Sequence, residues 1–278
     1  MNKDLNFKEN NNKMPDKNIP TIILCGGRGM RLQEETEFKP KPMVEIGGKP
    51  ILWHIMKIYA HYGYGDFILA LGYKGEYIKD YFLKQKYSET DFLLSTGKVG
   101  GAEFLNSGEL EKDNFNIIFA ETGLETPHGE RVLMLKKYIK GDLFMVTYGD
   151  GVADIDINKL VEFHKKRGKI ATITGVHPVS RWGLVNVDEN DLVTKLDQKP
   201  MLYEYVNGGF MVFNKKIFDF LKKGDMIEDT ISRLIPLKEL AIYKHEGFWY
   251  GMDTYKDFLF LNKLWEENPK WKIWEQKN

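Results

Sequence analysis

Residues 21–43 read TIILCGGRGMRLQEETEFKPKPM, and the organisation of the whole chain can be built outward from this stretch. Its first five residues, 21–25, are apolar or β-branched, which is typical of a short strand buried on both faces of a sheet. The strand ends at Gly26, Gly27 and Gly29. Glycines at the end of a strand let the backbone approach a ligand and turn its N–H groups toward it.

Two cations follow these glycines at fixed distances. Arg31 lies two residues after Gly29, and Lys41 stands between Pro40 and Pro42. The prolines fix φ and restrict their neighbours, so Lys41 is held on a preset backbone. Glycines and two cations together predict a site for a polyphosphate. The glycines alone are equally compatible with an ordinary turn, and the chain has neither G-x-G-x-x-G nor G-x-x-x-x-G-K-[ST] at this place.

The composition is that of an ordinary globular protein. Of the 278 residues, 42% are hydrophobic and 29% are charged, which is enough for one large core. Forty basic residues balance forty acidic ones, so no global field favours nucleic acid or an acidic membrane surface. Cys25, the only cysteine, excludes an internal disulfide and is expected to be a buried packing thiol. Without a signal peptide or an apolar run of about 20 residues, we expect a cytoplasmic protein.

Beyond this stretch, the apolar pattern alternates between strands and helices. Strands are predicted over 67–71, 115–121, 143–147 and 170–175, and helices from 51 to near 63 and over 75–86, 131–139 and 155–168. This alternation implies a Rossmann-like α/β fold, a mostly parallel sheet flanked by crossover helices. On the helix over 75–86, the residues expected on the inner face are Tyr77, Ile78, Tyr81 and Phe82.

The second half of the chain changes character. Short strands are expected over 184–187, 193–196, 205–213 and 241–245, short helices over 217–221 and 226–234, and a closing helix over 254–267. The first three strands fit a small antiparallel accessory lobe that covers one side of the pocket. The glycine-rich segment 91–114 is expected to be a hairpin-like excursion or an oligomer contact. Residues 19–278 form one predicted domain after a polar leader, 1–18, that is expected to be disordered.

Two aspartates carry signals for a metal site. Asp150 lies between Gly149 and Gly151 at the carboxyl end of a predicted strand, where open α/β sheets place their ligands. A carboxylate between glycines suits Mg²⁺, yet an isolated Gly-Asp-Gly is more often a turn or a helix cap. Mg²⁺ is commonly shared by one or two carboxylates and substrate phosphates, which makes Asp253 a second candidate. On the residues alone, a position near a helix N-cap is the preferred interpretation of Asp253.

The glycine-rich stretch resembles the signature of the sugar-phosphate nucleotidyltransferases, L-A-G-G-x-G-T-R-L followed by P-K-P-[ML]. The chain has LCGGRGMRL over 24–32 and PKPM over 40–43, with Cys25 in place of alanine and Met30 in place of threonine. The match runs from about residue 22 to residue 274. It is nearest to the cytidylyltransferases of the family, whose metal loop is similar to YGDGVAD over 148–154.

The resemblance implies roles for a set of residues, with a nucleotide half over 19–150 and a sugar-phosphate half over 151–278. The residues expected at the nucleotide are Leu24, Gly26, Gly27, Gly29, Thr122, Gly129 and Arg131. Those expected at the sugar phosphate are Gln198, Lys199, Asn207 and Gly208. The expected catalytic residues are Arg31 and Lys41 on the leaving pyrophosphate and Lys199 on the attacking phosphate, while Asp150 and Asp253 are expected to hold Mg²⁺.

Some positions depart from the family pattern. Gln198 stands where the family has glutamate, His128 and Glu130 replace a threonine and a glycine, and residues 250–251 replace Gln-Pro. An amide is both donor and acceptor and carries no charge, so the identity of the sugar is left open. The run at 207–209, Asn-Gly-Gly, matches the family's sugar-binding turn, although a hairpin turn explains it equally well.

The implied reaction is nucleotidyl transfer from CTP to a sugar 1-phosphate, with glucose 1-phosphate favoured. A different sugar, or UTP or dTTP in place of CTP, is the alternative within this class. A nucleotide-sensing homologue without turnover is the alternative outside it, and the retention of all five charged residues, Arg31, Lys41, Asp150, Lys199 and Asp253, argues against it. The expected partners are CTP, a sugar 1-phosphate and further copies of the chain in a homo-oligomer, without nucleic acid or membrane.

Overall fold

The computed structural model describes residues 18–27, 32, 39–88, 91–94, 102–104, 113 and 115–275. In this part of the chain, eight strands form a central sheet. They are β1 (Thr21–Leu24), β4 (Asp66–Leu71), β7 (Asn116–Glu121), β8 (Leu143–Tyr148), β10 (Ala171–Val176), β13 (Val206–Asn207), β14 (Met211–Asn214) and β15 (Leu240–Lys244). Their order is β13-β10-β14-β8-β1-β4-β7, and β15 pairs with β10.

Four neighbouring strands, β7, β4, β1 and β8, run parallel, as the alternating pattern predicts. β1 lies in the middle, where Leu24 faces Ala70 of β4 on one side and Tyr148 of β8 on the other. The chain moves outward from β1 through β4 and β7, and then returns to the other side of β1 with β8. This reversal is a topological switch point, and open α/β sheets bind ligands at the carboxyl ends of the strands around it.

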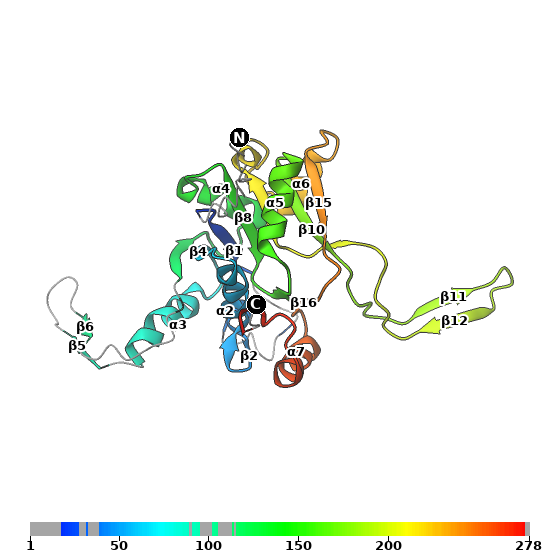
Figure 1. The fold of residues 1–278 in the computed structure, drawn as a ribbon, viewed down its shortest axis with the longest axis horizontal. Helices are drawn as coiled ribbons and strands as arrows, with labels where there is room; N and C mark the ends of the chain where they lie inside the picture. Colours follow the sequence, from blue (N-terminus) through cyan, green and yellow to red (C-terminus); the bar gives the residue numbers. More distant parts are fainter. Residues whose placement is uncertain are drawn as a thin grey trace, which may run out of the picture.

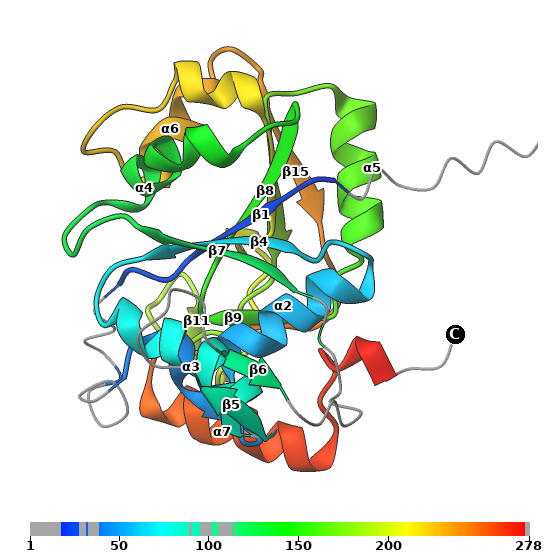
Figure 2. The same ribbon diagram turned by 90° about the vertical axis from the view of Figure 1, so that its left-hand side faces the viewer.

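Helices cover both faces of the sheet and make a molecule of three layers (Figure 1, Figure 2). Those of one layer are α2 (Ile51–His61), α3 (Gly75–Ser88), α5 (Ile157–Arg167) and α7 (Tyr255–Glu267), and those of the other are α4 (His128–Met134) and α6 (Ile227–Leu234). Successive residues of β1 pack in the two cores alternately, since Ile23 packs in the first core and Ile22 and Leu24 pack in the second. Cys25, directly after β1, is buried in the first core, which confirms the predicted packing thiol, and burial raises the pKa of the thiol.

Among the described residues, four two-stranded sheets lie outside the central sheet. They are β2 (Glu45–Ile46) with β3 (Lys49–Pro50), β5 (Phe92–Leu94) with β6 (Ala102–Phe104), β9 (Gly151–Ala153) with β16 (Trp249–Gly251), and β11 (Leu184–Val187) with β12 (Val193–Asp197). The last pair forms the distal part of an arm, residues 179–201, which extends far from the body of the molecule (Figure 1). Short 3-10 helices complete the described elements: η2 (Lys41–Met43), η3 (Leu135–Tyr138), η4 (Lys215–Asp219) and η5 (Ile273–Glu275).

The predicted α/β fold is confirmed, with local differences. The segment 205–213 is expected to be one strand, but it divides into β13 and β14 because Gly209 and Phe210, with φ of 85° and 34°, interrupt the extended backbone. β14 then lies inside the central sheet between β8 and β10, so the antiparallel lobe is smaller than expected. Tyr77 is 45% exposed and does not join the inner face of α3, whereas Ile78 is fully buried.

Some predictions fall wholly or partly outside the described residues. Of the leader, 1–18, the structure describes only Asn18, and of the segment 91–114 it describes two short strands that pair antiparallel, as a hairpin requires. The assignment of residues 19–278 to one domain stays a prediction. Each helix in the described part of the chain is too short or too polar to traverse a bilayer.

Candidate functional site

The glycine-rich loop and the Asp150 loop meet at the switch point, at the carboxyl ends of β1 and β8. Gly149 permits this approach, since a Cβ there would lie 3.0 Å from the carbonyl oxygen of Leu24 and 3.0 Å from Cγ of Pro42. The side chain of Leu24 is buried, so this residue offers its backbone to the loop. A Cβ on Gly27 would meet nothing within 4 Å. The remaining loop residues predicted to bind phosphate, Gly29 and Arg31, lie outside the described residues.

Lys41 lies between the two predicted metal ligands. Its Nζ is 2.6 Å from Oδ2 of Asp150 and 2.8 Å from Oδ1 of Asp253. A second cation reaches the same cluster, because Nη2 of Arg181 lies 2.6 Å from Oδ2 of Asp253. The structure therefore brings together Lys41, Asp150 and Asp253, although 212 positions of sequence separate the first from the last.

The β9–β16 ladder sets the spacing of the two aspartates. The strands pair antiparallel with Gly151 opposite Gly251, directly after Asp150 on one side and two residues before Asp253 on the other. The N–H of Met252 also donates to the carbonyl oxygen of Asp150 at 2.8 Å. Three-residue strands are thus enough to hold both carboxylates at one place.

The start of α7 determines the environment of Asp253. Thr254 is the N-cap of this helix, and its hydroxyl accepts a hydrogen bond from the N–H of Asp257. In return, the carboxylate of Asp257 accepts from the N–H groups of Asp253 and Thr254 at 3.0 and 2.8 Å. The predicted position of Asp253 near a helix N-cap is therefore confirmed, since it directly precedes the N-cap Thr254. Thr254 makes the side-chain capping bond, and the Asp253 carboxylate remains available to the cations.

Lys41 and Asp253 stabilise each other's charged forms. Burial disfavours the charged ammonium of Lys41, but the charges of Asp150 and Asp253 outweigh this effect and raise its pKa. Burial likewise disfavours the carboxylate of Asp253, but the hydrogen bond and charge of Lys41, together with Arg181, prevail and lower its pKa. Lys41 and Asp253 are therefore both ionised at neutral pH.

The donor set of this cluster fits a divalent cation that completes its coordination with substrate. Two carboxylates, from Asp150 and Asp253, already converge on one positive charge. Mg²⁺ is usually bound by one or two carboxylates plus phosphate oxygens and water. Across the described ranges, no group of three or more His, Cys, Asp or Glu side chains gathers to hold a metal. The pair of aspartates accordingly suits a metal that arrives with the nucleotide.

Arg131 is buried beneath the loops at the carboxyl edge of the sheet. Its Nη1 donates to the carbonyl oxygen of Leu71 at 3.0 Å and to Oγ1 of Thr122 at 2.5 Å. Its Nη2 donates to the carbonyl oxygens of Gly26 and Leu124, both at 3.3 Å. Gly26 leaves room for this arrangement, since a Cβ there would lie 2.2 Å from the guanidinium carbon. Arg131 and Thr122 thus tie the ends of β1, β4 and β7 together, and their contact with nucleotide stays a prediction.

Close packing explains why position 129 is a glycine. A Cβ on this residue would lie 2.8 Å from the carbonyl oxygens of Asp225 and Met226, so glycine allows α4 to lie against the segment before α6. The neighbouring His128 has its ring 5.8 Å from that of Tyr148, at the end of β8. The region predicted to lie near the nucleotide therefore borders the switch point.

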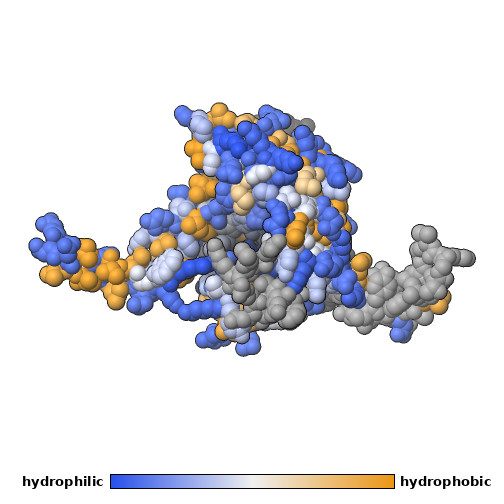
Figure 3. Space-filling view, turned by 180° about the vertical axis from the view of Figure 1, so that it is seen from behind, coloured by the Kyte–Doolittle hydropathy of each residue, from blue (hydrophilic) through white to orange (hydrophobic). Residues whose placement is uncertain are grey.

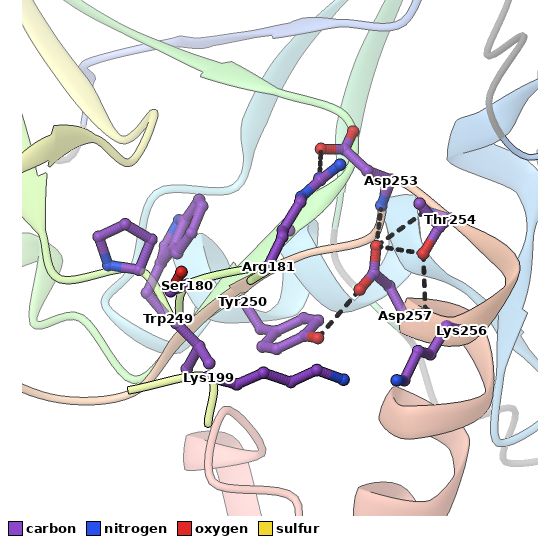
Figure 4. Close-up of a pocket in the computed structure, with 12 residues that line it drawn as sticks. Ser180, Arg181, Lys199, Trp249, Tyr250, Asp253, Thr254, Lys256 and Asp257 are labelled. Atoms are coloured by element: carbon purple, nitrogen blue, oxygen red, sulfur yellow. Dashed lines mark hydrogen bonds and ion pairs between the residues drawn. The ribbon is translucent and has the colours of Figure 1, made fainter. Parts of the chain in front are cut away.

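A cleft of about 330 Å³ lies between the base of the arm and the start of α7 (Figure 4). Arg181 and Lys199, from the two ends of the arm, both line it. Lys256, in the first turn of α7, approaches from the opposite side, and Trp249 of β16 contributes to the wall. Because Asp253 lines the cleft and also contacts Lys41, the cleft and the Lys41 cluster are continuous.

Lys199 and its neighbour Gln198 take different directions. Lys199 has a φ of 49°, the left-handed region that L residues rarely adopt, and its side chain extends into the cleft (Figure 4). Gln198 lies along the arm beside Gly183, where a Cβ would be 3.6 Å from the Gln198 Nε2. The structure therefore places Lys199, and not Gln198, among the residues that line the cleft.

Asn207 and Gly208 form a turn that Trp249 connects to the cleft. Oδ1 of Asn207 accepts from the N–H of Gly209 at 3.2 Å, and Nε1 of Trp249 donates to the carbonyl oxygen of Gly208 at 2.8 Å. Gly208 is tightly packed, since a Cβ there would lie 2.7 Å from Cγ1 of Val176. The turn does not close a hairpin, because β13 and β14 both pair with β10.

The sequence analysis missed three residues of the site, Arg181, Trp249 and Lys256. Lys256 and Trp249 each lie within four residues of Asp253, so a search around the predicted metal ligand could have found them. Arg181 had no such signal, because its ion pair with Asp253 spans 72 positions and it lies in an irregular segment at the base of the arm.

Comparisons with known proteins find relatives over most of the chain. A family model described as nucleotidyl transferase matches residues 20–268. A Bacillus subtilis (strain 168) protein named a probable glucose-1-phosphate cytidylyltransferase is 44% identical over 262 residues, which cover 92% of this chain and 100% of the relative. The glucose-1-phosphate cytidylyltransferase of Salmonella typhi is 40% identical over 264 residues, with the same coverage.

Solved structures share the fold. HddC from Yersinia pseudotuberculosis has a TM-score of 0.63 at 24% identity, and the match covers 88% of this chain and 98% of that one. The inositol-1-phosphate CTP transferase from T. maritima has a TM-score of 0.61 at 15% identity and covers 90% and 96% of the two chains. At these identities the likeness is one of fold.

Proposed function

The chain belongs to the nucleotidyl transferase family, and from this premise we propose that it is a glucose-1-phosphate cytidylyltransferase, which makes CDP-glucose and pyrophosphate from CTP and glucose 1-phosphate. The observation that carries the choice of substrates is the identity of 44% and 40% to relatives named for this activity, over 92% of the chain. The meeting of Lys41, Asp150 and Asp253 at the switch point supports the class of reaction.

The proposed chemical step is an in-line substitution at phosphorus. A phosphate oxygen of glucose 1-phosphate forms a bond to the α-phosphorus of CTP, and the bond from that phosphorus to the bridging oxygen of the β-phosphate breaks. Pyrophosphate leaves with the electron pair. Such a step requires the protein to align the reactants and neutralise charge. It requires no general base, because the attacking phosphate is already ionised near pH 7.

We assign the phosphate contacts to cations on separate elements. Gly26, Gly27 and Gly29 would offer backbone N–H groups to the triphosphate, and Arg31 and Lys41 would meet the leaving pyrophosphate. Lys199 would align the attacking phosphate. The support for Lys41 is its fixed position, because a cation that is already in place costs little reorganisation as charge develops on the leaving group.

Asp150 and Asp253 are the proposed ligands of Mg²⁺. When bound, the ion supplies a template and a Lewis acid for the phosphates. The two carboxylates are held at one place by the β9–β16 ladder, and Lys41 and Arg181 together balance their charges in the structure.

We further propose a cytoplasmic homo-oligomer in which the arm contacts another copy. Apolar side chains gather along the arm in the space-filling view, where it projects at the left (Figure 3). Those of the distal hairpin are more than half exposed: Val185, Val187, Leu192, Val193 and Leu196. Large exposed apolar patches commonly mark protein contacts. Sedimentation of a Val193→Lys, Leu196→Lys variant should give a smaller species than the wild type, and an unchanged sedimentation coefficient would argue against this contact.

The experiment that tests the function is a matrix of four nucleoside triphosphates against several sugar 1-phosphates, read as pyrophosphate release. We expect CTP with glucose 1-phosphate and Mg²⁺ to give the highest kcat/KM. A preference for UTP or dTTP would overturn the base assignment, and a different best sugar would overturn the glucose assignment. Absence of turnover with every pair would favour a nucleotide-sensing protein.

A single substitution tests the metal assignment within the same assay. Asp150→Asn keeps the volume of the side chain but removes one negative charge from the cluster. We expect lower turnover that added Mg²⁺ restores only in part. Unchanged turnover at saturating Mg²⁺ would contradict a ligand role for Asp150.

A further inference from the structure

The side chain of Lys256 extends into the cleft, although no ion pair with the described residues holds it there. Lys256 is the second residue of α7 and is exposed, yet its side chain extends along the cleft toward Lys199 from the opposite wall (Figure 4). The two lysines are 57 positions apart in the sequence and come from different elements, the end of the arm and the last long helix. Their ammonium groups face the same cavity of about 330 Å³.

No carboxylate of the described residues neutralises either ammonium. Within the described part of the chain, neither Lys199 nor Lys256 forms an ion pair with an Asp or Glu. The two acids that line the cleft are otherwise engaged. Asp253 pairs with Lys41 and Arg181, and Asp257 accepts hydrogen bonds from Thr254 and from the Tyr250 hydroxyl.

Two ammonium groups that face each other across a cleft repel each other, and an anion that binds between them offsets this repulsion. The side-chain contact and charge of the adjacent Lys256 lower the pKa of Lys199. Long lysine side chains in water are free to turn away from one another, so an arrangement that aims both at one cavity fits a ligand with more than one negative charge. A phosphate monoester, which carries a charge between −1.5 and about −2 at pH 7, is such a ligand.

We propose that Lys256 is a second phosphate-binding residue of the sugar-phosphate site, which clamps the phosphate of the sugar 1-phosphate together with Lys199. This inference rests on the proposed function, because that function makes a sugar 1-phosphate the ligand of the cleft. The cavity volume is at the lower end of the range of about 300–1,000 Å³ that is usual for small-molecule sites, so it suits a sugar phosphate and not a whole nucleotide. Lys256 adds charge from the side that Lys199 does not reach.

The test compares Lys256→Ala with Lys263→Ala, its matched control. Lys263 lies on the same helix, about two turns further on, and is also exposed, but it pairs with Glu267 and does not line the cleft. The dissociation constant of glucose 1-phosphate is measured by titration calorimetry without CTP, so no turnover is needed. We expect about tenfold weaker binding for Lys256→Ala, an unchanged value for Lys263→Ala, and recovery of most of the affinity in Lys256→Arg.

Kinetics separate a phosphate contact from a structural effect. In pyrophosphate release, Lys256→Ala should raise KM for glucose 1-phosphate about tenfold while KM for CTP stays within about twofold. Unchanged affinity for glucose 1-phosphate, or a rise in KM for CTP alone, would overturn the inference. Failure of the wild type to bind glucose 1-phosphate would also overturn it. Failure of the proposed function has a different signature, because the wild type would then release no pyrophosphate in the substrate matrix.

Discussion

The two groups of charges that meet at Asp253 are built differently. In the Lys41 cluster, one ammonium is 13% exposed, lies between two carboxylates, and is held by prolines and by the β9–β16 ladder. In the cleft, Lys199 and Lys256 are exposed, enter on long side chains from the arm and from α7, and have no acidic partner among the described residues. Each charged side chain of the first group has an oppositely charged partner in the protein, because Arg181 also pairs with Asp253. The two lysines of the cleft have no such partner among the described residues.

This difference assigns different tasks to similar side chains. A cation that the protein already holds in place needs little reorganisation when charge develops on a leaving group, so its removal should raise the barrier of the chemical step. A cation without a protein partner is completed by the ligand, so its removal should weaken binding. The comparison between Lys41 and Lys199 therefore predicts that kcat falls in one case and that KM rises in the other.

The largest effect is expected for Lys41→Ala. Stabilisation of charge at a leaving group is typically worth about 10² to 10³ in rate, so kcat should fall at least 100-fold. The substitution also leaves Asp150 and Asp253 close together without their shared counter-charge. Lys39→Ala is the control, since it removes the same charge two residues earlier, from a side chain 3.7 Å from Glu45. Equal kcat values for the two variants would contradict a role of Lys41 at the leaving group.

A smaller effect of the other kind is expected for Lys199→Ala. Loss of a charged hydrogen bond costs about 1.5–3 kcal/mol, which corresponds to a rise of at least tenfold in KM for glucose 1-phosphate. The dissociation constant of CTP should be nearly unaltered. Lys195→Ala is the matched control on the arm, because Lys195 pairs with Asp197 at 2.7 Å. If Lys199→Ala lowered kcat and Lys41→Ala raised KM, the two phosphate sites would be reversed.

Gln198→Glu should have little effect, because Gln198 lies along the arm and does not line the cleft. We expect kcat/KM for glucose 1-phosphate to stay within about twofold. An ionised glutamate accepts stronger, charge-assisted hydrogen bonds than an amide, so a rise of about fivefold, or about 1 kcal/mol, would show that the side chain at this position reaches the sugar. Loss of activity on glucose 1-phosphate, with a wild type that prefers another sugar phosphate, would contradict the glucose assignment.

The smallest effect concerns pH. Lys199 binds phosphate in its protonated form, so affinity for glucose 1-phosphate should fall as pH rises through its pKa. Because the Lys256 ammonium lowers that pKa, removal of this charge in Lys256→Met should move the alkaline loss of affinity to higher pH. Lys263→Met should leave it in place. Calorimetric titrations over a series of alkaline buffers measure the midpoint, and coincident midpoints in wild type and Lys256→Met would show that the two lysines do not interact.

The features that the sequence predicts are those with local signals. The buried strands β1 and β8 and the glycines that follow them depend on short apolar runs and on turn residues, and the structure has both. The resemblance to the family pointed to Asp150, Asp253 and Lys199. The pairing of strands far apart in the sequence could not be predicted. β9 and β16 are each three residues long and show no periodicity, and the position of β14 between β8 and β10 depends on the whole sheet.

The Lys41 cluster also has a consequence for the order of events during protein synthesis. Lys41 and Asp253 are 212 positions apart, and at roughly 5–20 residues per second the ribosome needs about 10–40 s to make the intervening chain. During that interval the glycine-rich loop and Lys41 have emerged, but one of the two carboxylates that hold Lys41 does not yet exist. Nascent chains are therefore expected to lack the complete Lys41 cluster until the β9–β16 ladder closes, and chains that terminate before Asp253 should not turn over CTP.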